Sequence, residues 1–569
     1  MRTAVNHSVS RMPEWVVAGL AGVVLAVVMT WPITPRISQI GRVDSKDAMY
    51  AMWNVAWVAH ALTTDPLNVF NANIFYPHTN TLAYSESNLL TGALGIPAWL
   101  ITKNVYATYN SVTLIGFVLS FVCMYALARR LSGSRLGAAV AAIGFAYCPY
   151  VYARFPHIQL LMTFGMPLSM LALHALVDRP SWRRGAALGA ALAAQGLTCA
   201  YYGILAGLAV GLGVIVYAAF GRRWSDWSYW RAVAVALVTC VLLIGPLFLP
   251  YLTIQEAGFQ RTLEEARRYA FGWQAWLASA GRTHDWMLPW LRERGWRGGV
   301  LFPGFVTSLL GAAGIAIALM RGRGLPAGAR QAGVFYGLLG VLGVWLTRGP
   351  DAGLYTLLYN AVPIFRLLRA PERFGVAVML ALAVGTAFAV AWIASRLRER
   401  RSLTRHATAS TVAAAALLVA LALADKWIAP LRFRDALPVP SPYYMLARAP
   451  RGAVAEFPYF TRPSELSEYS AYMFFSTYHW QPLINGYSDH MPKDFLETIE
   501  PISRFPTPES FALMRERDAR YVLLHLDDYH PVRRREVEQG LAHYAAQGVL
   551  RFLDRDGDVV LYQIARYPD

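Results

Sequence analysis

Residues 15–33 read WVVAGLAGVVLAVVMTWPI, an almost uninterrupted apolar run. A helix needs about 20 mainly apolar residues to cross the hydrocarbon core of a bilayer. This run is longer and more uniformly apolar than the core of a cleaved signal peptide, and no small-residue cleavage site follows it. It therefore predicts a retained membrane-spanning helix.

Further apolar runs follow, in a chain of 569 residues that is 56% hydrophobic and only 15% charged. They lie at 106–128, 136–151, 157–177, 185–199, 201–220, 232–254, 300–320, 331–347, 374–395 and 407–424. This composition is typical of integral membrane proteins. We predict a polytopic α-helical membrane protein with about 11 transmembrane helices.

Arginines gather in short gaps that each follow an even-numbered run. These gaps are 129–135, 179–184, 222–231, 321–330 and 396–405. The positive-inside rule places them in the cytoplasm together with the N-terminus, and an odd number of spans then places the C-terminal part outside. Counting the Pro97-containing stretch 88–101 as a span would put the gap at Arg129 on the wrong side. We expect a bacterial inner-membrane protein with its C-terminal domain in the periplasm.

The C-terminal part reads as a soluble α/β domain. Its expected elements are strands at Ala453–Phe457 and Tyr521–His525, a helix near Arg533–Gln547, and a hairpin around Asp556-Gly557 that joins Leu550–Leu553 to Val559–Ile564. We therefore divide the chain into a membrane domain, 1–424, and a periplasmic domain, 425–569. The membrane domain includes a large first outer loop at 34–105.

The net charge of +17 does not indicate a nucleic-acid partner. The arginine clusters fall between apolar runs, and no basic helix is interleaved with aromatic residues for base stacking. Membrane lipids are the expected partners of these charges. The cysteines lie in or beside apolar runs, so neither a disulfide framework nor a thiolate metal site is predicted.

The first outer loop opens with GRVDSKDAMY, residues 41–50, which contains Asp44 and Asp47. Tyr50, Trp53 and Trp57 follow at helical spacing and predict an amphipathic helix along the membrane surface, with the tryptophans at headgroup depth. The two aspartates would lie at this surface, just before the helix. N-capping of the helix is the alternative role for them.

In the order of these features the chain resembles the GT-C glycosyltransferases and is similar to protein O-mannosyltransferases and aminoarabinose transferases. The resemblance covers roughly residues 15–200. It comprises the acidic pair, the tyrosine and amphipathic helix, a Pro-containing stretch LGIPAWL at 94–100, a second run ending in ALARRLSG at 126–133, and a small-residue third run ending near Cys148-Pro149.

This resemblance implies an inverting transfer of a sugar from a polyprenyl-phosphate carrier to a glycan, lipid or protein acceptor. It also implies that Asp47 acts as the base, with Asp44 as second choice. A hydroxyl is a poor nucleophile until a carboxylate accepts its proton, and one carboxylate is enough when the leaving group is already a phosphate. Tyr50 and His60 are candidate substrate-binding residues on the same helix.

The chain departs from the family after the third run. The family often has a second aspartate there, whereas this chain has RFPHIQ at 154–159, with His157 and Gln159. His157, Gln159 and Glu86 are therefore candidate substrate-binding groups. Glu86 and His157 together with Asp44 and Asp47 could hold a divalent cation, Mg²⁺ or Mn²⁺, although no spacing is diagnostic of a metal.

A second arginine-rich stretch, FRLLRAPERF at 365–374, lies on the predicted outer side, where the positive-inside bias should deplete arginine. Arg366, Arg369 and Arg373 would share one helical face if the helical turn continued to Pro371. Pro371 itself disfavours this continuity. Such a cluster suits the phosphate of a lipid carrier. Snorkelling to phospholipid headgroups, with Glu372 as an internal partner, is the alternative.

Other functions stay open. A transporter or flippase could use the same arginines for a lipid phosphate or an anionic solute, but it should carry ionisable groups near the midplane of its spans. An inactive GT-C-like scaffold is a third possibility. The loop 255–299 and the segment YHWQPLINGYSDH at 478–490 could contact a lipid-linked sugar, or could be a solvated face and a structural turn.

Overall fold

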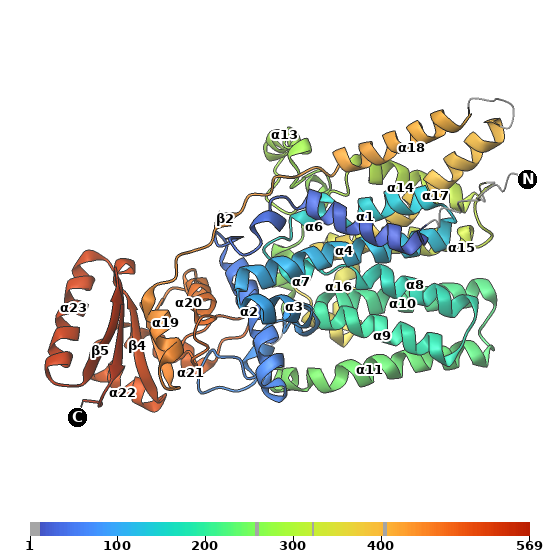
Figure 1. Ribbon diagram of the computed structural model, residues 1–569. Coiled ribbons are helices and arrows are strands. Elements are labelled where there is room, and N and C mark those ends of the chain that lie inside the picture. The colour runs from blue at the N-terminus through green and yellow to red at the C-terminus, as the bar shows by residue number, and fades with distance from the viewer. Residues whose placement is uncertain (1–11, 257–260, 321, 323, 402–406, 569) are drawn as a thin grey trace, which may run out of the picture.

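A computed structural model of the chain describes residues 12–256, 261–320, 322, 324–401 and 407–568. Long helices lie side by side in a bundle, and the C-terminal part forms an α/β domain at one end of it (Figure 1). The first described helix, α1 (Glu14–Met29), begins at the opposite end of the bundle.

Each predicted apolar run contains one helix of the bundle. These helices are α1 (Glu14–Met29), α4 (Val105–Ser132), α5 (Arg135–Ala146), α8 (Gly165–Asp178), α9 (Trp182–Thr198), α10 (Ala200–Gly221), α11 (Trp227–Glu256), α14 (Phe305–Leu319), α15 (Ala329–Thr347), α17 (Gly375–Arg401) and α18 (Ala407–Ala424). Among the described residues, 5 helices are long and apolar enough to cross a membrane, namely α4, α10, α11, α15 and the helix that contains α17. The eleven-span count stays a prediction.

Two runs form shorter helices than expected. The run 136–151 ends its helix at Ala146, since Cys148 takes an extended conformation before Pro149, which begins the separate short helix α6 (Pro149–Tyr152). The run 157–177 holds the short helix α7 (Ile158–Leu161) before α8, because the backbone leaves the helical conformation at Met162.

Small residues allow the bundle helices to touch. A Cβ on Gly314 of α14 would lie 1.8 Å from the carbonyl oxygen of Gly385 on α17. A Cβ on Gly189 of α9 would lie 2.3 Å from the carbonyl oxygen of Ala236 on α11. In a lipid environment helix association depends on such close backbone contact, because apolar burial alone gives no preference for protein over lipid.

Shorter helices from the loops cover the end of the bundle that carries the C-terminal domain. These are α2 (Lys46–Thr64), α3 (Leu89–Thr102), α12 (Leu263–Arg268), α13 (Met287–Glu293) and α16 (Leu354–Ala361). The expectation that α2 places its tryptophans at headgroup depth is wrong. Trp53 is 0% exposed, and Trp57 packs against Trp480 of the C-terminal part with ring centroids 5.7 Å apart. Helix α2 lies between the bundle and this domain, so its apolar residues are covered by protein.

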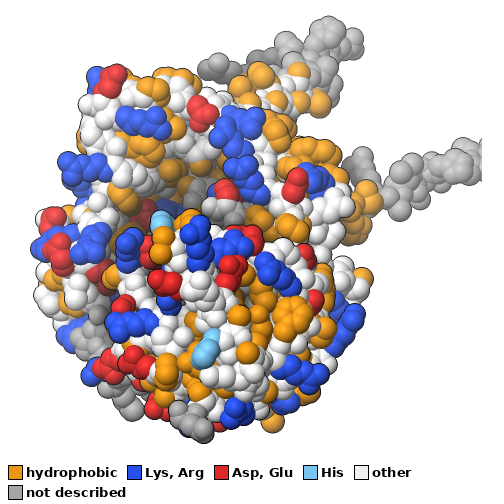
Figure 2. Space-filling view, turned by 90° about the vertical axis from the view of Figure 1, so that its left-hand side faces the viewer, with side chains coloured by type: hydrophobic (Ala, Val, Ile, Leu, Met, Phe, Trp, Pro, Cys, Tyr) orange, Lys and Arg blue, Asp and Glu red, His pale blue; other side chains and the backbone are white. Residues whose placement is uncertain are grey.

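The C-terminal part contains the predicted strands and hairpin. Its four-stranded sheet has the order β3-β4-β6-β5, with β3 and β4 parallel and the other pairs antiparallel. The strands are β3 (Ala453–Phe457), β4 (Ala519–His525), β5 (Leu550–Asp556) and β6 (Val559–Ile564), and the helices are α19 (Ser441–Arg448), α20 (Tyr469–Ser476), α21 (Lys493–Ser503), α22 (Pro508–Glu516) and α23 (Pro531–Ala546). Basic and acidic side chains are scattered together over the face of this end of the molecule that Figure 2 shows.

The first outer loop and the C-terminal part are joined through their backbones. The amide of Leu483 donates to the carbonyl of Asn73 at 2.9 Å, and the amide of Phe75 donates to the carbonyl of Asn485 at 3.1 Å. Farther up the chain, β1 (Ile40–Gly41) pairs with β2 (Arg434–Asp435). Because residues of both segments share one hydrophobic core, the predicted soluble part is attached to the bundle over a broad contact.

The opposite end of the bundle carries arginines of the predicted cytoplasmic side. Arg129 and Arg135 bind the Glu14 carboxylate, at 2.7 and 2.9 Å, where α1 begins. Among the other arginines of these gaps, Arg321, Arg323 and Arg405 lie outside the described residues. The arrangement agrees with the predicted orientation, which itself stays a prediction.

Candidate functional site

A cavity of about 830 Å³ opens where the bundle, the first outer loop and the C-terminal domain meet. Its polar end is lined by Asp47, Tyr50, Tyr84, Ser85, Glu86, Asn88, His157, Gln159, Arg261, Arg369, Arg373, Tyr487, Ser488 and Asp489. It continues between α9, α10 and α11 along Leu188, Leu192, Gly196, Ile204, Gly207, Leu208, Gly211, Val214, Val233, Leu237, Ile244 and Phe248. The cavity therefore joins a charged chamber to a long apolar groove.

Asp47 and His157 meet at the polar end. Asp47 lies in the first turn of α2, and its Oδ2 is 3.6 Å from Nε2 of His157, which directly precedes α7. Both side chains remain accessible from the cavity, at 55% and 36% exposure. Ser45, and neither aspartate, caps α2, because its hydroxyl accepts from the amide of Ala48 at 3.4 Å. The Asp47 carboxylate is therefore left to the cavity.

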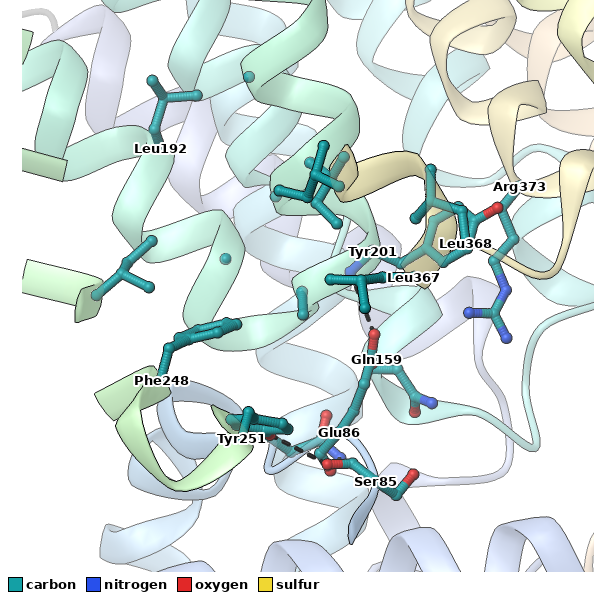
Figure 3. A pocket seen from close by; sticks show the side chains of 18 of the residues that line it. Ser85, Glu86, Gln159, Leu192, Tyr201, Phe248, Tyr251, Leu367, Leu368 and Arg373 are labelled. Atoms are coloured by element: carbon teal, nitrogen blue, oxygen red, sulfur yellow. Dashed lines mark hydrogen bonds between the residues drawn. The ribbon is translucent and has the colours of Figure 1, made fainter. Parts of the chain in front are cut away.

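Arg373 projects into the same space as Gln159 (Figure 3). Its guanidinium lies 4.7 Å from the centroid of the Tyr201 ring. Within the described part of the chain, no ion pair or hydrogen bond of the Arg373 side chain is found. Arg369 also lines the cavity, where it donates to Asp489 of the C-terminal domain at 2.9 Å.

The expectation that the three arginines share a helical face is wrong. A short 3-10 helix covers Pro363–Leu367, and the chain is extended at Leu368 before a second 3-10 helix starts at Pro371. The proline forces this break, since the residue before it avoids the helical conformation. Arg366 consequently points away from the cavity lining, toward the carbonyl of Tyr359 at 3.5 Å. Glu372 does not serve these arginines, because it binds Arg154.

Glu86 lines the cavity and also supports the start of α10. Its Oε1 accepts from the amide of Tyr201 at 3.2 Å, and burial raises the pKa of the Glu86 carboxyl, against the opposing charge of Arg373. The carboxyl thus stabilises one of the amides that a helix start leaves without an intrahelical partner. Tyr251 closes this corner, donating to the carbonyl of Ser85 at 3.0 Å (Figure 3).

Two further candidates lie outside the cavity lining. Asp44 binds Arg42, with Nε and Oδ1 2.9 Å apart, and this hydrogen bond holds the pKa of Asp44 below its usual range although burial opposes it. His60 stacks on Trp480 with ring centroids 4.4 Å apart. Burial, with smaller effects from nearby cations, lowers the pKa of His60 to about 4. Asp44 thus pairs within the first loop, whereas His60 joins this loop to the C-terminal domain.

The four predicted cation ligands do not come together in the structure. Asp44 is paired with Arg42, and Glu86 is used at α10, so Asp47 and His157 remain. Two such side chains would leave most of the coordination of Mg²⁺ or Mn²⁺ to water and to a substrate phosphate. Across the described residues, the group of metal-type side chains close enough to share an ion is His525, Asp527 and Asp528, in the C-terminal domain.

The most important lining residue without a predicted role is Asp489. Although its burial favours the neutral acid, Arg369 and Arg261 hold the pKa of Asp489 below its usual range. The segment 478–490 and the loop 255–299 were both expected as possible sugar contacts, but composition alone could not single out Asp489 or Arg261. Their meeting depends on how the C-terminal domain sits on the bundle.

Comparison with solved structures finds several that resemble this chain. Arabinofuranosyltransferase AftD from Mycobacteria has a TM-score of 0.59 to this chain, at 14% identity, over 97% of this chain and 40% of AftD. The archaeal oligosaccharyltransferase AglB from Archaeoglobus fulgidus has a TM-score of 0.47 at 13% identity, over 90% of this chain and 69% of AglB. ArnT from Cupriavidus metallidurans has a TM-score of 0.39 at 13% identity, over 96% of this chain and 97% of ArnT.

This chain thus spans less than half of the length of AftD. AftD, AglB and ArnT are GT-C superfamily glycosyltransferases, and the likeness to AftD shows that this chain has a GT-C-like fold. No protein-family model and no curated protein matches the chain.

Proposed function

We propose that this protein is a glycosyltransferase that moves a sugar from a polyprenyl-phosphate carrier to an acceptor at the outer face of a bacterial inner membrane. The observation that carries this proposal is the continuity of one cavity. It joins an accessible carboxylate, the Arg373 guanidinium, whose described contact is the Tyr201 ring, and an apolar groove between α9, α10 and α11. A lipid-linked sugar phosphate has these same three parts. The GT-C-like fold supports the enzyme class.

Asp47 is the proposed base. As the acceptor hydroxyl oxygen attacks the anomeric carbon, its proton passes to the Asp47 carboxylate, and the bond between the anomeric carbon and the phosphate oxygen breaks. His157, 3.6 Å from Asp47, orients the carboxylate and the acceptor. General-base assistance of this kind contributes about 10²- to 10⁴-fold in rate. Inversion at the anomeric carbon is expected from the family resemblance.

Arg373 and Arg369 are the proposed ligands of the carrier phosphate. The leaving phosphate gains charge as the sugar departs, and guanidinium donors stabilise that charge best where water is excluded. Gln159 faces the same space and supplies a neutral donor. Tyr50, on the first-loop side of the chamber, is placed to contact the sugar or acceptor.

The groove between α9, α10 and α11 is the proposed site of the polyprenyl chain. Gly207 and Gly211 have open space where a side chain would project, so this part of the groove is unfilled by protein. An isoprenoid chain needs only apolar walls and room. The groove leads from this region toward Arg373, as a lipid with a phosphate head requires.

The test is transfer of radiolabelled sugar from a panel of synthetic polyprenyl-phosphate monosaccharides by purified protein in lipid. We expect Asp47→Asn to lower the rate of transfer, or of donor hydrolysis, by at least about 100-fold. Asp65→Asn is the matched control, since Asp65 ends the same helix outside the cavity lining. Equal turnover by Asp47→Asn and wild type would remove Asp47 as the base.

A second measurement separates binding from chemistry. Arg373→Gln should weaken binding of polyprenyl phosphate by roughly 10- to 100-fold, because it removes a charge-assisted donor from a water-poor site. Asp47→Asn should bind the same lipid as tightly as wild type. Failure of wild type to bind polyprenyl phosphate would contradict the proposed donor.

A further inference from the structure

A carboxylate of the C-terminal domain occupies the space between two arginines of the bundle. Oδ1 of Asp489 lies 2.9 Å from Nη1 of Arg369 and 3.2 Å from Nη2 of Arg261. Its Oδ2 accepts from the hydroxyl of Ser85 at 2.9 Å. Two guanidiniums and one hydroxyl thus converge on a single anionic group, and all four residues line the cavity.

The two arginines come from separate loops that are fixed to each other. The amide of Arg261 donates to the carbonyl of Arg366 at 3.3 Å, and the hydroxyl of Tyr359 donates to the carbonyl of Arg261 at 2.7 Å. Arg369 also lies near the Tyr269 ring, with 5.8 Å between its guanidinium carbon and the ring centroid. The backbone of Arg261 and the guanidinium of Arg369 therefore have contacts that do not involve Asp489.

Two carboxylates among the described residues face these guanidiniums. Glu265 binds Arg261 at 2.9 Å and approaches Arg369 at 3.8 Å, and Asp489 contacts both arginines more evenly. If the Asp489 carboxylate moved away, the two guanidiniums would lose one of these carboxylates in a partly buried place, where positive charge attracts an anion strongly.

Asp489 is the member of this cluster that belongs to the C-terminal domain. It lies in an irregular segment that follows Gly486, outside the sheet of that domain. Its side chain is 30% exposed, so an anion in the cavity can reach it. A phosphate beside an Asp489 carboxylate that stayed in place would face a like charge, which opposes binding.

We propose that Arg261 and Arg369 form a phosphate subsite of the cavity, that Asp489 fills it in the ligand-free protein, and that a phosphate group replaces the carboxylate on binding. The subsite rests on these contacts alone. Its use by the lipid carrier rests on the proposed function. Displacement of Asp489 would couple donor binding to movement of the 486–490 segment against the bundle.

The first test uses inorganic phosphate, so that it does not depend on the lipid carrier. The full-length protein in lipid nanodiscs is unfolded by heat at increasing phosphate, with ionic strength held constant by chloride. We expect the Tm of Asp489→Asn to rise with phosphate, because a ligand that binds only the folded state stabilises it. Wild type and Asp494→Asn should show a smaller rise, because phosphate must first displace the Asp489 carboxylate. Asp494 is the control, a carboxylate of the same domain bound by His78 at 3.0 Å outside the cavity lining.

The test still applies if Asp489→Asn has a lower Tm than wild type without phosphate, because the expected result is the rise of its Tm with phosphate. The same phosphate response should disappear when Arg369→Gln is added to Asp489→Asn. Identical phosphate dependence in Asp489→Asn and Asp494→Asn would overturn the subsite.

The second arm measures affinity for polyprenyl phosphate. Asp489→Asn should bind it roughly tenfold more tightly than wild type, because the lipid no longer competes with the carboxylate. Weaker binding by Asp489→Asn would overturn the proposal, since Asp489 would then position the arginines for the ligand. A phosphate response without any polyprenyl-phosphate binding, in wild type or variant, would support the subsite and reject the proposed donor.

Discussion

Glu372 and Arg373 are neighbours in the chain, but Glu372 is ion-paired inside the protein and Arg373 faces the cavity. Glu372 accepts from Arg154 at 2.6 Å, and both side chains are nearly buried, at 10% and 11% exposure. Arg373 faces the cavity, and its described contact is the Tyr201 ring. Glu372 completes an ion pair inside the protein, whereas Arg373 presents a positive charge to a ligand that enters the cavity.

The same contrast appears in two other acidic residues. Asp425 accepts from the amides of Phe305 and Val306 at 3.0 Å each, where α14 begins, and also binds Lys426 at 2.6 Å. Among the described residues, the ion-pair partner of Asp47 is His157, at the longer distance of 3.6 Å. A buried charge with a close partner holds helices together, whereas an incompletely paired charge on a cavity wall is available to a ligand. The predictions below test this distinction.

The largest expected effect is on stability. Glu372→Gln should lower the free energy of unfolding by about 3–5 kcal/mol, because Arg154 is left as an uncompensated buried charge. Arg373→Gln, one residue away, should change it by no more than about 1 kcal/mol, since it removes only a cation–π contact. Denaturant unfolding of both variants in mixed micelles measures the difference.

Replacing both members of the Arg154–Glu372 ion pair provides the control. Arg154→Met with Glu372→Leu should recover most of the lost stability, because apolar residues of similar volume often substitute for a buried ion pair without cost. Equal destabilisation by Glu372→Gln and Arg373→Gln would mean that the two charged side chains contribute equally to the stability of the protein, against this prediction.

A smaller effect is expected in the apolar part of the cavity. Gly207→Leu places a side chain in open space on α10 and should weaken binding of a long polyprenyl phosphate by roughly tenfold, while a short-chain, soluble analogue binds as before. The helix itself should tolerate leucine, which is a better helix former than glycine. Binding titrations with both lipids in nanodiscs measure the ratio.

Gly19→Leu is the matched control. Gly19 also has open space beyond its Cα, but it lies on α1, away from the cavity. Equal loss of affinity for the long and short lipids in Gly207→Leu would show that the groove does not hold the polyprenyl chain.

The sequence predicted the helices and strands better than the contacts between them. Apolar runs located the bundle helices, and period-2 patterns with Asp556-Gly557 located the strands and hairpin, because these signals are local. The burial of Trp53 and Trp57 was not predictable, since it depends on α20 and Trp480 from a distant part of the chain.

The candidate site divides in the same way. Asp47, Glu86, His157, Arg369 and Arg373 were named from the sequence and line one cavity. Arg366 was grouped with them on the assumption of a continuous helix, which Pro371 interrupts. Asp489 carried no local signal, because its place between two arginines follows from tertiary structure alone.

The smallest expected effect concerns an ion pair whose cation is a histidine and can therefore lose its charge. In the C-terminal domain, Nε2 of His525 lies 2.9 Å from Oε1 of the buried Glu456. Burial opposes the charged imidazole, but Glu456 outweighs it and raises the pKa of His525 above its ordinary value. A raised folded-state pKa means that the charged pair contributes its full stabilisation below the unfolded value, near pH 6.5.

That stabilisation should therefore be lost as the pH rises through the raised pKa of His525, which the arginine pairs do not show because guanidinium stays charged. Thermal unfolding between about pH 5 and pH 9 should give a Tm that falls with pH in wild type and less steeply in His525→Gln. His543→Gln, at an exposed position on α23, is the control and should follow wild type. Parallel curves for all three proteins would mean that Glu456 holds His525 without its charge, as a neutral hydrogen-bonded pair.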